Sequence, residues 1–287
     1  MKRALVALLL CLAASAISPG RAQDIREVND YGGLSFSLTG KATQGGLLIG
    51  KTKPNSRVRA NGVDLQVASN GAFLIGFGRD YDSTFVEVVV TAPDQSATET
   101  RSIPVLPRVF DVQSITGVAQ KYVEPSPKDL KRIAEERRVI AEARARIADA
   151  SDFEAGFVWP VEGPISGVFG SQRIFNGQPR APHSGVDIAA GRGSTVVAAS
   201  RGVVTLAHKD LFFNGNVVIV DHGLSLSTVY VHLDEIAVRQ GQRVNIGEPL
   251  GKVGATGRVT GPHLHWGANI AGQAIDPQLL VGPMVQR

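Results

Sequence analysis

The chain has 287 residues, of which 43% are hydrophobic and 20% charged, so it exceeds one average domain and can bury a core. This composition argues against disorder as the main state. The formal charge of +4 falls to about +1 without residues 1–23, which remove three of the 30 basic residues and none of the 26 acidic ones. No basic stretch is interleaved with aromatic residues, so we expect no nucleic-acid partner.

The first 23 residues are typical of a secretory signal peptide. Lys2 and Arg3 precede an apolar run over residues 4–17, and small residues lead to a cleavage site expected after Ala22. A membrane anchor needs roughly 20 apolar residues, so we expect export and no membrane span after cleavage, with an uncleaved anchor as the alternative. The only cysteine, Cys11, lies here, so the mature protein would lack disulfides and thiolate ligands.

Residues 24–120 predict a small β-sandwich-like or barrel domain. Short apolar or alternating runs are separated by turn residues, including Asn61-Gly62 and Asn70-Gly71. The expected strands cover residues 34–38, 47–49, 57–59, 72–77 and 85–91. This segment contains no histidine and its carboxylates lie in turn-like surroundings, so we expect an accessory domain for placement, docking or occlusion.

Residues 121–156 predict a linker and one amphipathic helix. Ser126 suits the N-cap, Pro127 the first helical position and Asp129 the positive end of the helix dipole. The helix is expected to run to about Ala150. Its apolar stripe consists of Leu130, Ile133, Ile140 and Ile147. We expect it to lie on one domain or to bridge two, and a lid or partner-binding helix is the alternative.

All the histidines fall within residues 157–287, and this segregation indicates where chemistry should be sought. The six residues are His183, His208, His222, His232, His263 and His265. We expect His208 to be a surface residue and His222 to be structural or at the rim of a groove.

The first of three motifs in this part is His183 followed four residues later by Asp187. The spacing would fit one face of a helix, but Gly185 and the β-branched Val186 and Ile188 favour a turn that enters a strand. Alone, this pattern is weak.

The second motif is the alternating stretch over residues 227–233. A regular strand would bury Val229, Val231 and Leu233 on one face. The opposite face would then carry Thr228, Tyr230 and His232. This predicts that Tyr230 and His232 together line a groove.

The third motif is His263 and His265, which are two residues apart in an extended segment and therefore point to one face of a sheet. Catalytic zinc usually takes three protein ligands and keeps one open position. His183, Asp187 and one of this pair meet that count, which leaves the other histidine and His232 for proton transfer. Spacing alone does not decide which member of the pair binds metal.

Together these motifs resemble the lysostaphin/LytM-type zinc metallopeptidases, which cleave peptides of bacterial peptidoglycan. The resemblance covers roughly residues 158–277 and includes His183-Ser-Gly-Val-Asp187, Tyr230-Val-His-Leu233 and Gly261-Pro-His-Leu-His-Trp-Gly267. It implies a largely antiparallel β fold around a groove. The expected architecture is therefore mainly β, with the β-sandwich-like domain, the linker helix and a C-terminal antiparallel metallopeptidase domain over residues 157–287.

The resemblance also implies roles for individual residues. It makes His183, Asp187 and His265 the ligands of one zinc ion. His263 and His232 would orient or deprotonate the water that zinc activates and stabilise the oxyanion. Two further residues, Asn176 and Tyr230, are candidates for substrate contact.

These observations favour an exported zinc metalloendopeptidase that hydrolyses peptidoglycan stem peptides or cross-links in the periplasm or cell envelope. The expected partners are peptidoglycan peptides and the cell-division or cell-wall machinery. The alternative is a noncatalytic activator of another cell-wall hydrolase with the same fold. A third reading is a scaffold that binds peptidoglycan through the N-terminal β-domain.

Overall fold

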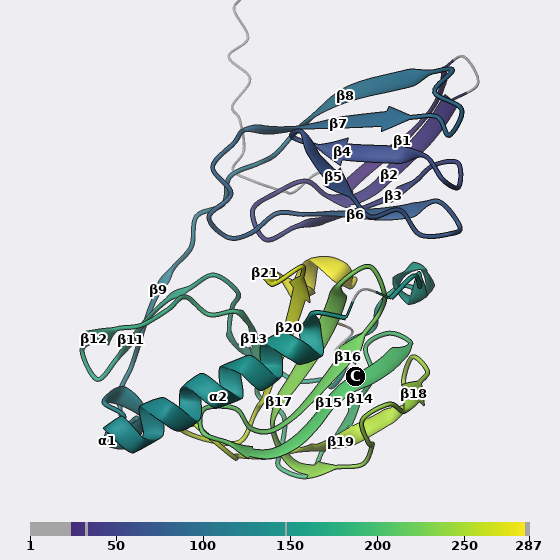
Figure 1. The fold of residues 1–287 in the computed structure, drawn as a ribbon. Coiled ribbons are helices and arrows are strands. Elements are labelled where there is room, and N and C mark those ends of the chain that lie inside the picture. The colour runs from purple at the N-terminus through teal and green to yellow at the C-terminus, as the bar shows by residue number, and fades with distance from the viewer. Residues whose placement is uncertain (1–23, 32–33, 147, 285–287) are drawn as a thin grey trace, which may run out of the picture.

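The structure is a computed structural model that describes residues 24–31, 34–146 and 148–284. The predicted signal peptide and Ile147 of the predicted apolar stripe lie outside these residues. The chain is mainly β with antiparallel sheets and one long helix, as predicted, and it forms an upper and a lower part in Figure 1.

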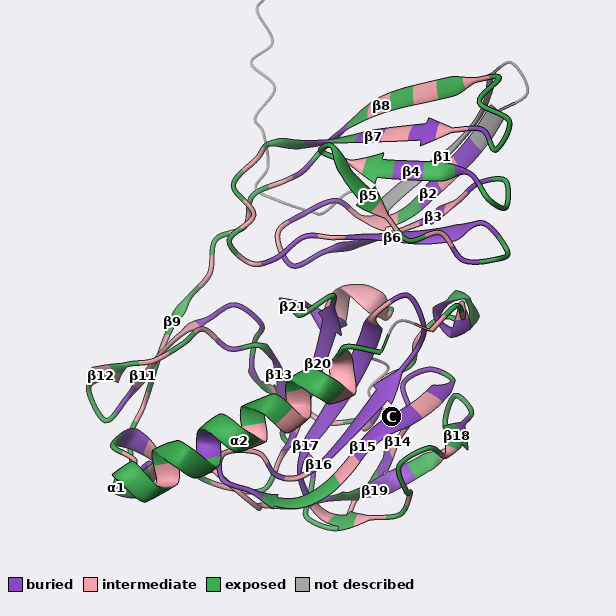
Figure 2. Cartoon of the chain, viewed as in Figure 1, coloured by how far each residue is buried: buried purple, intermediate pink, exposed green. Residues whose placement is uncertain are grey.

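Two four-stranded antiparallel sheets make up the first part of the chain. One has the order β1-β2-β3-β6 and the other the order β5-β4-β7-β8. The strands are β1 (Asp24–Tyr31), β2 (Leu34–Lys41), β3 (Leu47–Lys51), β4 (Arg57–Ala60), β5 (Val63–Leu65), β6 (Ala72–Gly76), β7 (Phe85–Thr91) and β8 (Thr98–Pro104). Both sheets bury side chains such as Leu38, Phe73 and Val88 in one apolar core, visible as purple segments in Figure 2. This is the packing of a β-sandwich.

The hairpin between β4 and β5 shows how the predicted turn chemistry works. Asn61 and Gly62 both have positive φ, 46° and 79°, which suits a two-residue turn that matches strand twist. The edge strand β8 was not predicted, because its sequence is polar and only Ile103 is buried along it. An edge strand needs no apolar alternation when β7 supplies its backbone partners.

The helix α2 (Pro127–Arg144) begins as predicted. Ser126 is its N-cap and its Oγ accepts a hydrogen bond from the backbone N–H of Asp129 at 3.2 Å. A shorter helix, α1 (Gln120–Val123), precedes it. The predicted end near Ala150 is wrong. Beyond Arg144 the chain instead makes tertiary bonds, in which the Asp149 carboxylate accepts from Ser69 N and the Ala148 carbonyl from Leu224 N.

The inner face of α2 lies on the lower part of the molecule. Val139, Ile140 and Ala143 pack against a buried cluster from β15, β16 and β17, and Figure 1 shows the helix across these strands. Leu130 of the predicted stripe is instead 54% exposed. The helix therefore lies on one domain, as one of the two favoured predictions stated.

The second part of the chain contains a ten-stranded sheet. Its main path is β10-β13-β20-β17-β16-β15-β18, while β14, β19 and β21 pair off this path. These strands are β10 (Ile165–Gly167), β13 (Gly185–Ile188), β14 (Thr195–Val197), β15 (Gly202–Leu211), β16 (Gly215–Asp221), β17 (Leu226–Ile236), β18 (Arg243–Val244), β19 (Pro249–Val253), β20 (Leu264–Ile270) and β21 (Gln273–Ile275). A separate small sheet joins β11 (Gln172–Phe175) to β12 (Gln178–Pro179) and, in parallel, to β9 (Val112–Ile115). Short 3-10 helices cover Asp152–Ala155 and Pro277–Leu280.

A third buried cluster joins the two parts of the molecule. It combines Leu47 and Leu74 of the first part with Phe153, Leu226 and Ile270 of the second. An ion pair of 2.9 Å between Arg108 and the buried carboxylate of Asp276 lies beside it. Among the helices of residues 24–146 and 148–284, none has the length and apolar character needed to cross a membrane.

A line of buried polar groups crosses the core of the second part. Nδ1 of His222 lies 2.7 Å from the Arg201 carbonyl and Nε2 lies 2.8 Å from the Thr228 hydroxyl. The Thr228 and Tyr230 hydroxyls are 2.9 Å apart, and the Tyr230 oxygen accepts from Ala199 N. His222 is therefore structural, as one of its predicted roles stated, and burial lowers its pKa to about 4.

Acid should destabilise the fold through His222. Its pKa lies below the 6.5 of an unfolded chain, so the stabilisation is present above pH 6.5 and is lost as the pH falls towards 4. We expect the free energy of unfolding to fall by about 2 kcal/mol more in the parent than in His222→Gln between pH 7 and pH 5. Denaturant titrations of both proteins at both pH values measure this difference. Equal losses would contradict it.

Candidate metal centre

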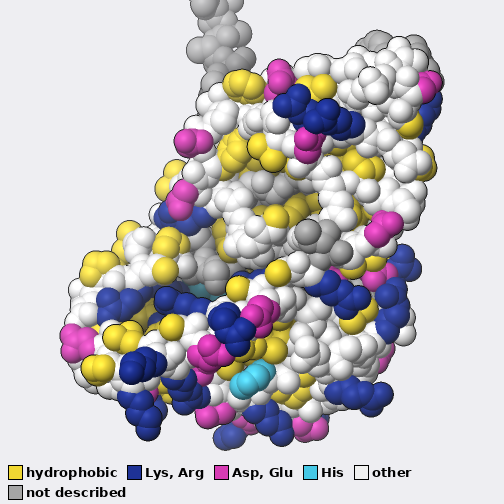
Figure 3. Space-filling view, viewed as in Figure 1, with side chains coloured by type: hydrophobic (Ala, Val, Ile, Leu, Met, Phe, Trp, Pro, Cys, Tyr) yellow, Lys and Arg dark blue, Asp and Glu magenta, His cyan; other side chains and the backbone are white. Residues whose placement is uncertain are grey.

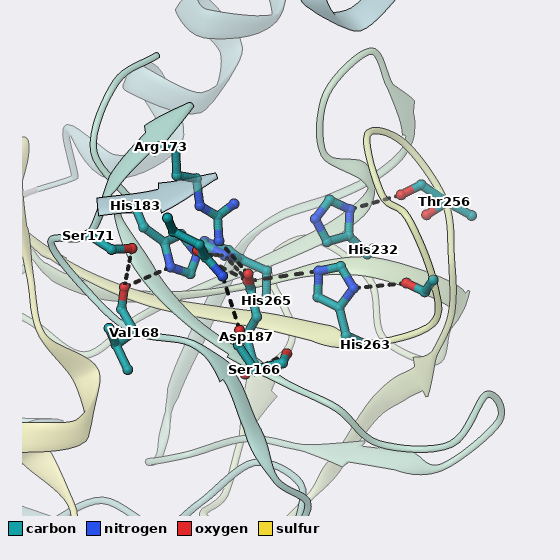
Figure 4. Close-up of polar contacts among 12 residues, drawn as sticks. Ser166, Val168, Ser171, Arg173, His183, Asp187, His232, Thr256, His263 and His265 are labelled. Carbon is teal, nitrogen blue, oxygen red and sulfur yellow. Dashed lines mark hydrogen bonds and ion pairs between the residues drawn. The ribbon is translucent and has the colours of Figure 1, made fainter. Parts of the chain in front are cut away.

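Three side chains from two neighbouring strands and one loop meet at a single point (Figure 4). Strand pairing places Asp187 of β13 opposite His265 of β20, and His183 lies in the turn that leads into β13. His183 Nε2 is 2.9 Å from His265 Nδ1 and 3.0 Å from Asp187 Oδ1, and the last two atoms are 2.9 Å apart. The structure thus brings the three predicted ligands into one triangle of donor atoms.

Hydrogen bonds around the triangle fix how its members are presented. His183 Nδ1 lies 3.0 Å from the Val168 carbonyl, so it carries the proton and leaves the Nε2 lone pair facing the triangle. The second carboxylate oxygen of Asp187 accepts from Arg173 Nη2 at 2.5 Å. Both contacts orient the donor atoms without occupying them.

The charge states also favour electron-pair donation. Burial would raise the pKa of Asp187, but its close contacts with the imidazoles of His183 and His265 outweigh burial and hold that pKa well below the usual range. Burial lowers the pKa of His265 to about 4. At neutral pH the triangle therefore contains one carboxylate and, at His265, a neutral imidazole.

The triangle fits a metal ion. Bonds of about 2.0–2.2 Å in a tetrahedral site would separate ligand atoms by roughly 3.3–3.6 Å, which is about 0.3–0.7 Å longer than the distances found. All three atoms can offer a lone pair to a cation. A cation with one open coordination position would satisfy all of them.

Two further imidazoles lie beside the triangle. His263 Nε2 is 3.8 Å from Asp187 Oδ1, and the rings of His263 and His232 are 4.8 Å apart. Each ring places Nδ1 against a backbone carbonyl, that of Gly261 for His263 at 2.9 Å and that of Thr256 for His232 at 2.8 Å. Their Nε2 lone pairs are therefore free for proton transfer.

His232 reaches this position through an irregularity in β17. Leu233 pairs with Asn216 and Tyr230 with Val218, so Val231 and His232 together oppose the one residue Val217. This is a β-bulge, and His232 adopts a left-handed φ of 67° within it. Strained backbone of this kind is typical of functional positions.

The bulge overturns the prediction that Tyr230 and His232 share a face. Tyr230 is fully buried in the main core of the second part, and burial raises its pKa to about 12. Val229 and Val231 face the other way and belong to the cluster under α2. Tyr230 is therefore a core residue and not a substrate contact.

The remaining predicted residues lie away from the triangle. Asn176 is at the turn between β11 and β12, where its side chain donates to the Val118 carbonyl at 2.7 Å and accepts from Val118 N at 3.3 Å. It is not among the described residues that line the cavity next to the metal centre, and its substrate contact stays a prediction. His208 is exposed on β15, as predicted.

A cavity of about 730 Å³ opens beside the triangle and the two further histidines. Its lining includes Val123, Ile133 and Ala134 of α1 and α2, together with Phe175 and Phe213. The cavity is also lined by several arginines that the sequence analysis did not single out. They come from separate segments, and no local run of basic residues marks them.

An antiparallel β fold with this donor triangle, two further imidazoles and a cavity defines the type of site found in metallopeptidases. Comparison with known families agrees, because residues 181–277 match Peptidase family M23. The C-terminal part of the chain is a peptidase M23 domain of the LytM/lysostaphin family.

The most similar relatives include cell-wall endopeptidases. The chain is 38% identical over 121 residues to peptidoglycan DD-endopeptidase ShyA of Vibrio cholerae. The aligned residues make up 42% of this chain and 28% of ShyA. It is 43% identical over 95 residues to DD-carboxypeptidase/endopeptidase Mpg of Neisseria meningitidis. These residues make up 33% of this chain and 22% of Mpg. The chain thus spans less than a third of the length of these relatives.

Similarity to a solved structure extends across both parts of the molecule. A crystal structure described as peptidase M23 from Pseudomonas aeruginosa has a TM-score of 0.63 and 29% sequence identity. The match covers 84% of this chain and 96% of that one. The similarity is therefore not limited to the M23 domain.

Removing the Tyr230 hydroxyl tests its assignment to the core. Tyr230→Phe would leave Ala199 N without its partner, so we expect the free energy of unfolding to fall by about 1–3 kcal/mol. Denaturant unfolding measures the change. Tyr122→Phe is the matched control, because that hydroxyl has no hydrogen bond among the described residues, and it should change stability by less than about 0.5 kcal/mol. Equal effects of the two substitutions would contradict the assignment.

Proposed function

We propose that this chain is an exported zinc metalloendopeptidase that hydrolyses peptide bonds of bacterial peptidoglycan. The observation that carries the proposal is the triangle of His183, Asp187 and His265 with two further imidazoles beside it, in an M23 domain. The name of ShyA as a peptidoglycan DD-endopeptidase supports the substrate class. Residues 157–287 would carry the activity, and residues 24–120 would place or occlude it.

In this proposal His183 Nε2, Asp187 Oδ1 and His265 hold the zinc ion. When bound, zinc supplies polarisation of the scissile carbonyl and lowers the pKa of water to about 7. The chain contributes the rigidity of the site. Asp187 and His265 sit on paired strands, and the Val168 carbonyl holds the ring of His183 in one tautomer.

His263 is the proposed general base. Its Nε2 is on the side of Asp187, and its Nδ1–H is held by the Gly261 carbonyl. It would take a proton from the attacking water at Nε2 as the oxygen–carbon bond forms. The same proton then passes to the leaving amine nitrogen as the peptide C–N bond breaks, which returns His263 to its neutral form.

His232 is the proposed orienting group for the water. Burial and the neighbouring His263 and His265 hold the pKa of His232 well below its usual range, so it is neutral. With Nδ1–H donating to the Thr256 carbonyl, Nε2 accepts a hydrogen bond and does not donate one. An accepting role toward water therefore suits this tautomer better than the expected donor role toward the oxyanion.

Export and cellular context are part of the proposal. Residues 1–23 have the pattern of a signal peptide, which would deliver the protein to the periplasm or cell envelope. Cell division protein DipM of Caulobacter vibrioides is 33% identical to this chain over 153 residues. These residues make up 50% of this chain and 24% of DipM. This similarity supports association with the division machinery as a further partner class.

Metal content tests the ligand assignment. Purified parent protein should contain about one zinc ion per chain, whereas His265→Ala and Asp187→Ala should lose it, because a three-ligand site does not survive removal of one donor. Elemental analysis after dialysis measures the ratio. His208→Ala, which changes an exposed histidine, should keep the parent value. Retention of zinc by both ligand variants would refute the assignment.

Digestion of purified sacculi tests the reaction and the base. We expect the parent to release soluble muropeptides and His263→Ala to do so about 10²- to 10⁴-fold more slowly, with its zinc content retained, because the variant lacks only proton transfer. Mass spectrometry of the products identifies the bond cleaved, and His208→Ala is again the control.

Two results of this digestion would count against the proposal. A His263→Ala variant as active as the parent would remove the base assignment. A zinc-loaded parent that releases nothing but stimulates a second cell-wall hydrolase would replace hydrolysis with the regulatory alternative.

A further inference from the structure

The cavity beside the metal centre is strongly basic. Figure 3 shows Lys and Arg side chains gathered over α2 and the β11–β12 hairpin. The arginines that line the cavity, here termed the arginine cluster, are Arg137, Arg144, Arg173, Arg180 and Arg258. The only carboxylate among the described lining residues is Asp187, which belongs to the metal centre. The wall thus carries far more positive than negative charge.

Arg258 is the most informative member of the arginine cluster. Its guanidinium lies over the rings of Phe213 and Phe175, 4.5 Å and 4.8 Å from their centroids. No hydrogen bond or ion pair from its side chain occurs within the described part of the chain. Burial, together with the charges of Arg173 and Arg180, lowers its pKa to about 10. The guanidinium therefore lies against two rings with its donors unused.

Other members of the arginine cluster also have donor atoms without an acceptor, or donate only to uncharged groups. The Nε atoms of Arg144 and Arg173 are buried without an acceptor in the described structure. Arg180 donates only to uncharged oxygens, namely the carbonyls of Val123 at 2.6 Å and Pro179 at 2.8 Å and the Gln178 side chain at 2.5 Å. Arg173 has one carboxylate partner, Asp187.

Arginines outside the cavity show that pairing is normal in this protein. On the exposed side of α2, Arg132 pairs with Glu136 at 2.6 Å and Arg138 pairs with Glu135 at 2.6 Å. Arg144 lies on the same helix but has no ion pair among the described residues. Arg144 therefore differs from the arginines on the exposed side of the same helix.

Burying several cations without counter-charges costs free energy, and a bound anion would offset that cost. The planar fork of a guanidinium matches a carboxylate through two parallel hydrogen bonds. We propose that the arginine cluster is the subsite for a free carboxylate of the peptide substrate, next to the scissile bond. This inference rests on the proposed function, and it gives that function a preference for acidic peptides.

The subsite would orient the substrate as well as attract it. A carboxylate fixed between Arg258 and Arg180 sets the direction in which the peptide crosses the metal centre, because those arginines and the triangle line one cavity. Charge-assisted hydrogen bonds of this type change binding by roughly tenfold or more. Loss of one arginine should therefore weaken binding of the acidic peptide more than binding of its amide.

The test compares three forms of one synthetic peptidoglycan stem peptide: with free carboxylates, amidated only at its C-terminus, and amidated only at its internal carboxylate. Isothermal titration calorimetry with the zinc-loaded full chain measures binding, and kcat/KM is measured in parallel. The parent should bind the free peptide at least about tenfold more tightly than one of the amidated forms. The form that loses affinity identifies which carboxylate is held.

The variants are Arg258→Gln and Arg180→Gln, with Arg239→Gln as the control, because Arg239 is exposed and outside the cavity lining. In both cavity variants the ratio of the affinities for the free and the amidated peptide should approach one, whereas the control should keep the parent ratio. Arg258→Lys should restore part of the preference, because it keeps the charge without the planar fork. Arg180→Gln carries the test if Arg258→Gln does not fold, as judged by thermal melting.

The outcomes separate this inference from the proposed function. A parent that cleaves peptides but binds free and amidated forms equally would overturn the subsite and leave hydrolysis standing. A parent that prefers the free carboxylate without cleaving the peptide would support the subsite and contradict hydrolysis. Unchanged ratios in both cavity variants, or no binding of the free peptide at millimolar concentration, would overturn the subsite.

Discussion

The site depends on the hydrogen-bonded register of three adjacent strands. Backbone pairing puts His265 of β20 between Asp187 of β13 on one side and Val231 of β17 on the other. A shift of one residue in either pairing would turn His265 to the opposite face of the sheet, because side chains alternate along a strand. The sheet therefore positions Asp187 and His265, and only His183 of the donor triangle comes from a loop.

Local patterns predicted much of this arrangement. The β-branched residues around Asp187 predict a strand from a few neighbouring residues, and β13 forms there. His265 lies in β20, and His263 immediately precedes that strand. Turn chemistry at Asn61-Gly62 and the cap at Ser126 were likewise predictable, because each acts over a few residues. The roles assigned to the individual site residues remain proposals.

Features that arise between distant segments could not be predicted in this way. The bulge at His232 has no glycine to mark it and follows from the pairing with β16, so regular alternation wrongly placed His232 on the face of Tyr230. The end of α2 is determined by tertiary bonds to Ser69 and Leu224. The arginine cluster is assembled from well-separated parts of the chain and becomes visible only after folding.

The cluster that joins the two parts of the molecule has a mechanical consequence. Gly76 of β6 packs directly against Ile270, and even an added Cβ at that glycine would come within 2.3 Å of the isoleucine. Ile270 ends the strand that carries His265, so the seam between the two parts and the donor triangle share one backbone segment. A force that separates the parts would therefore act, through Ile270, on the strand that carries His265.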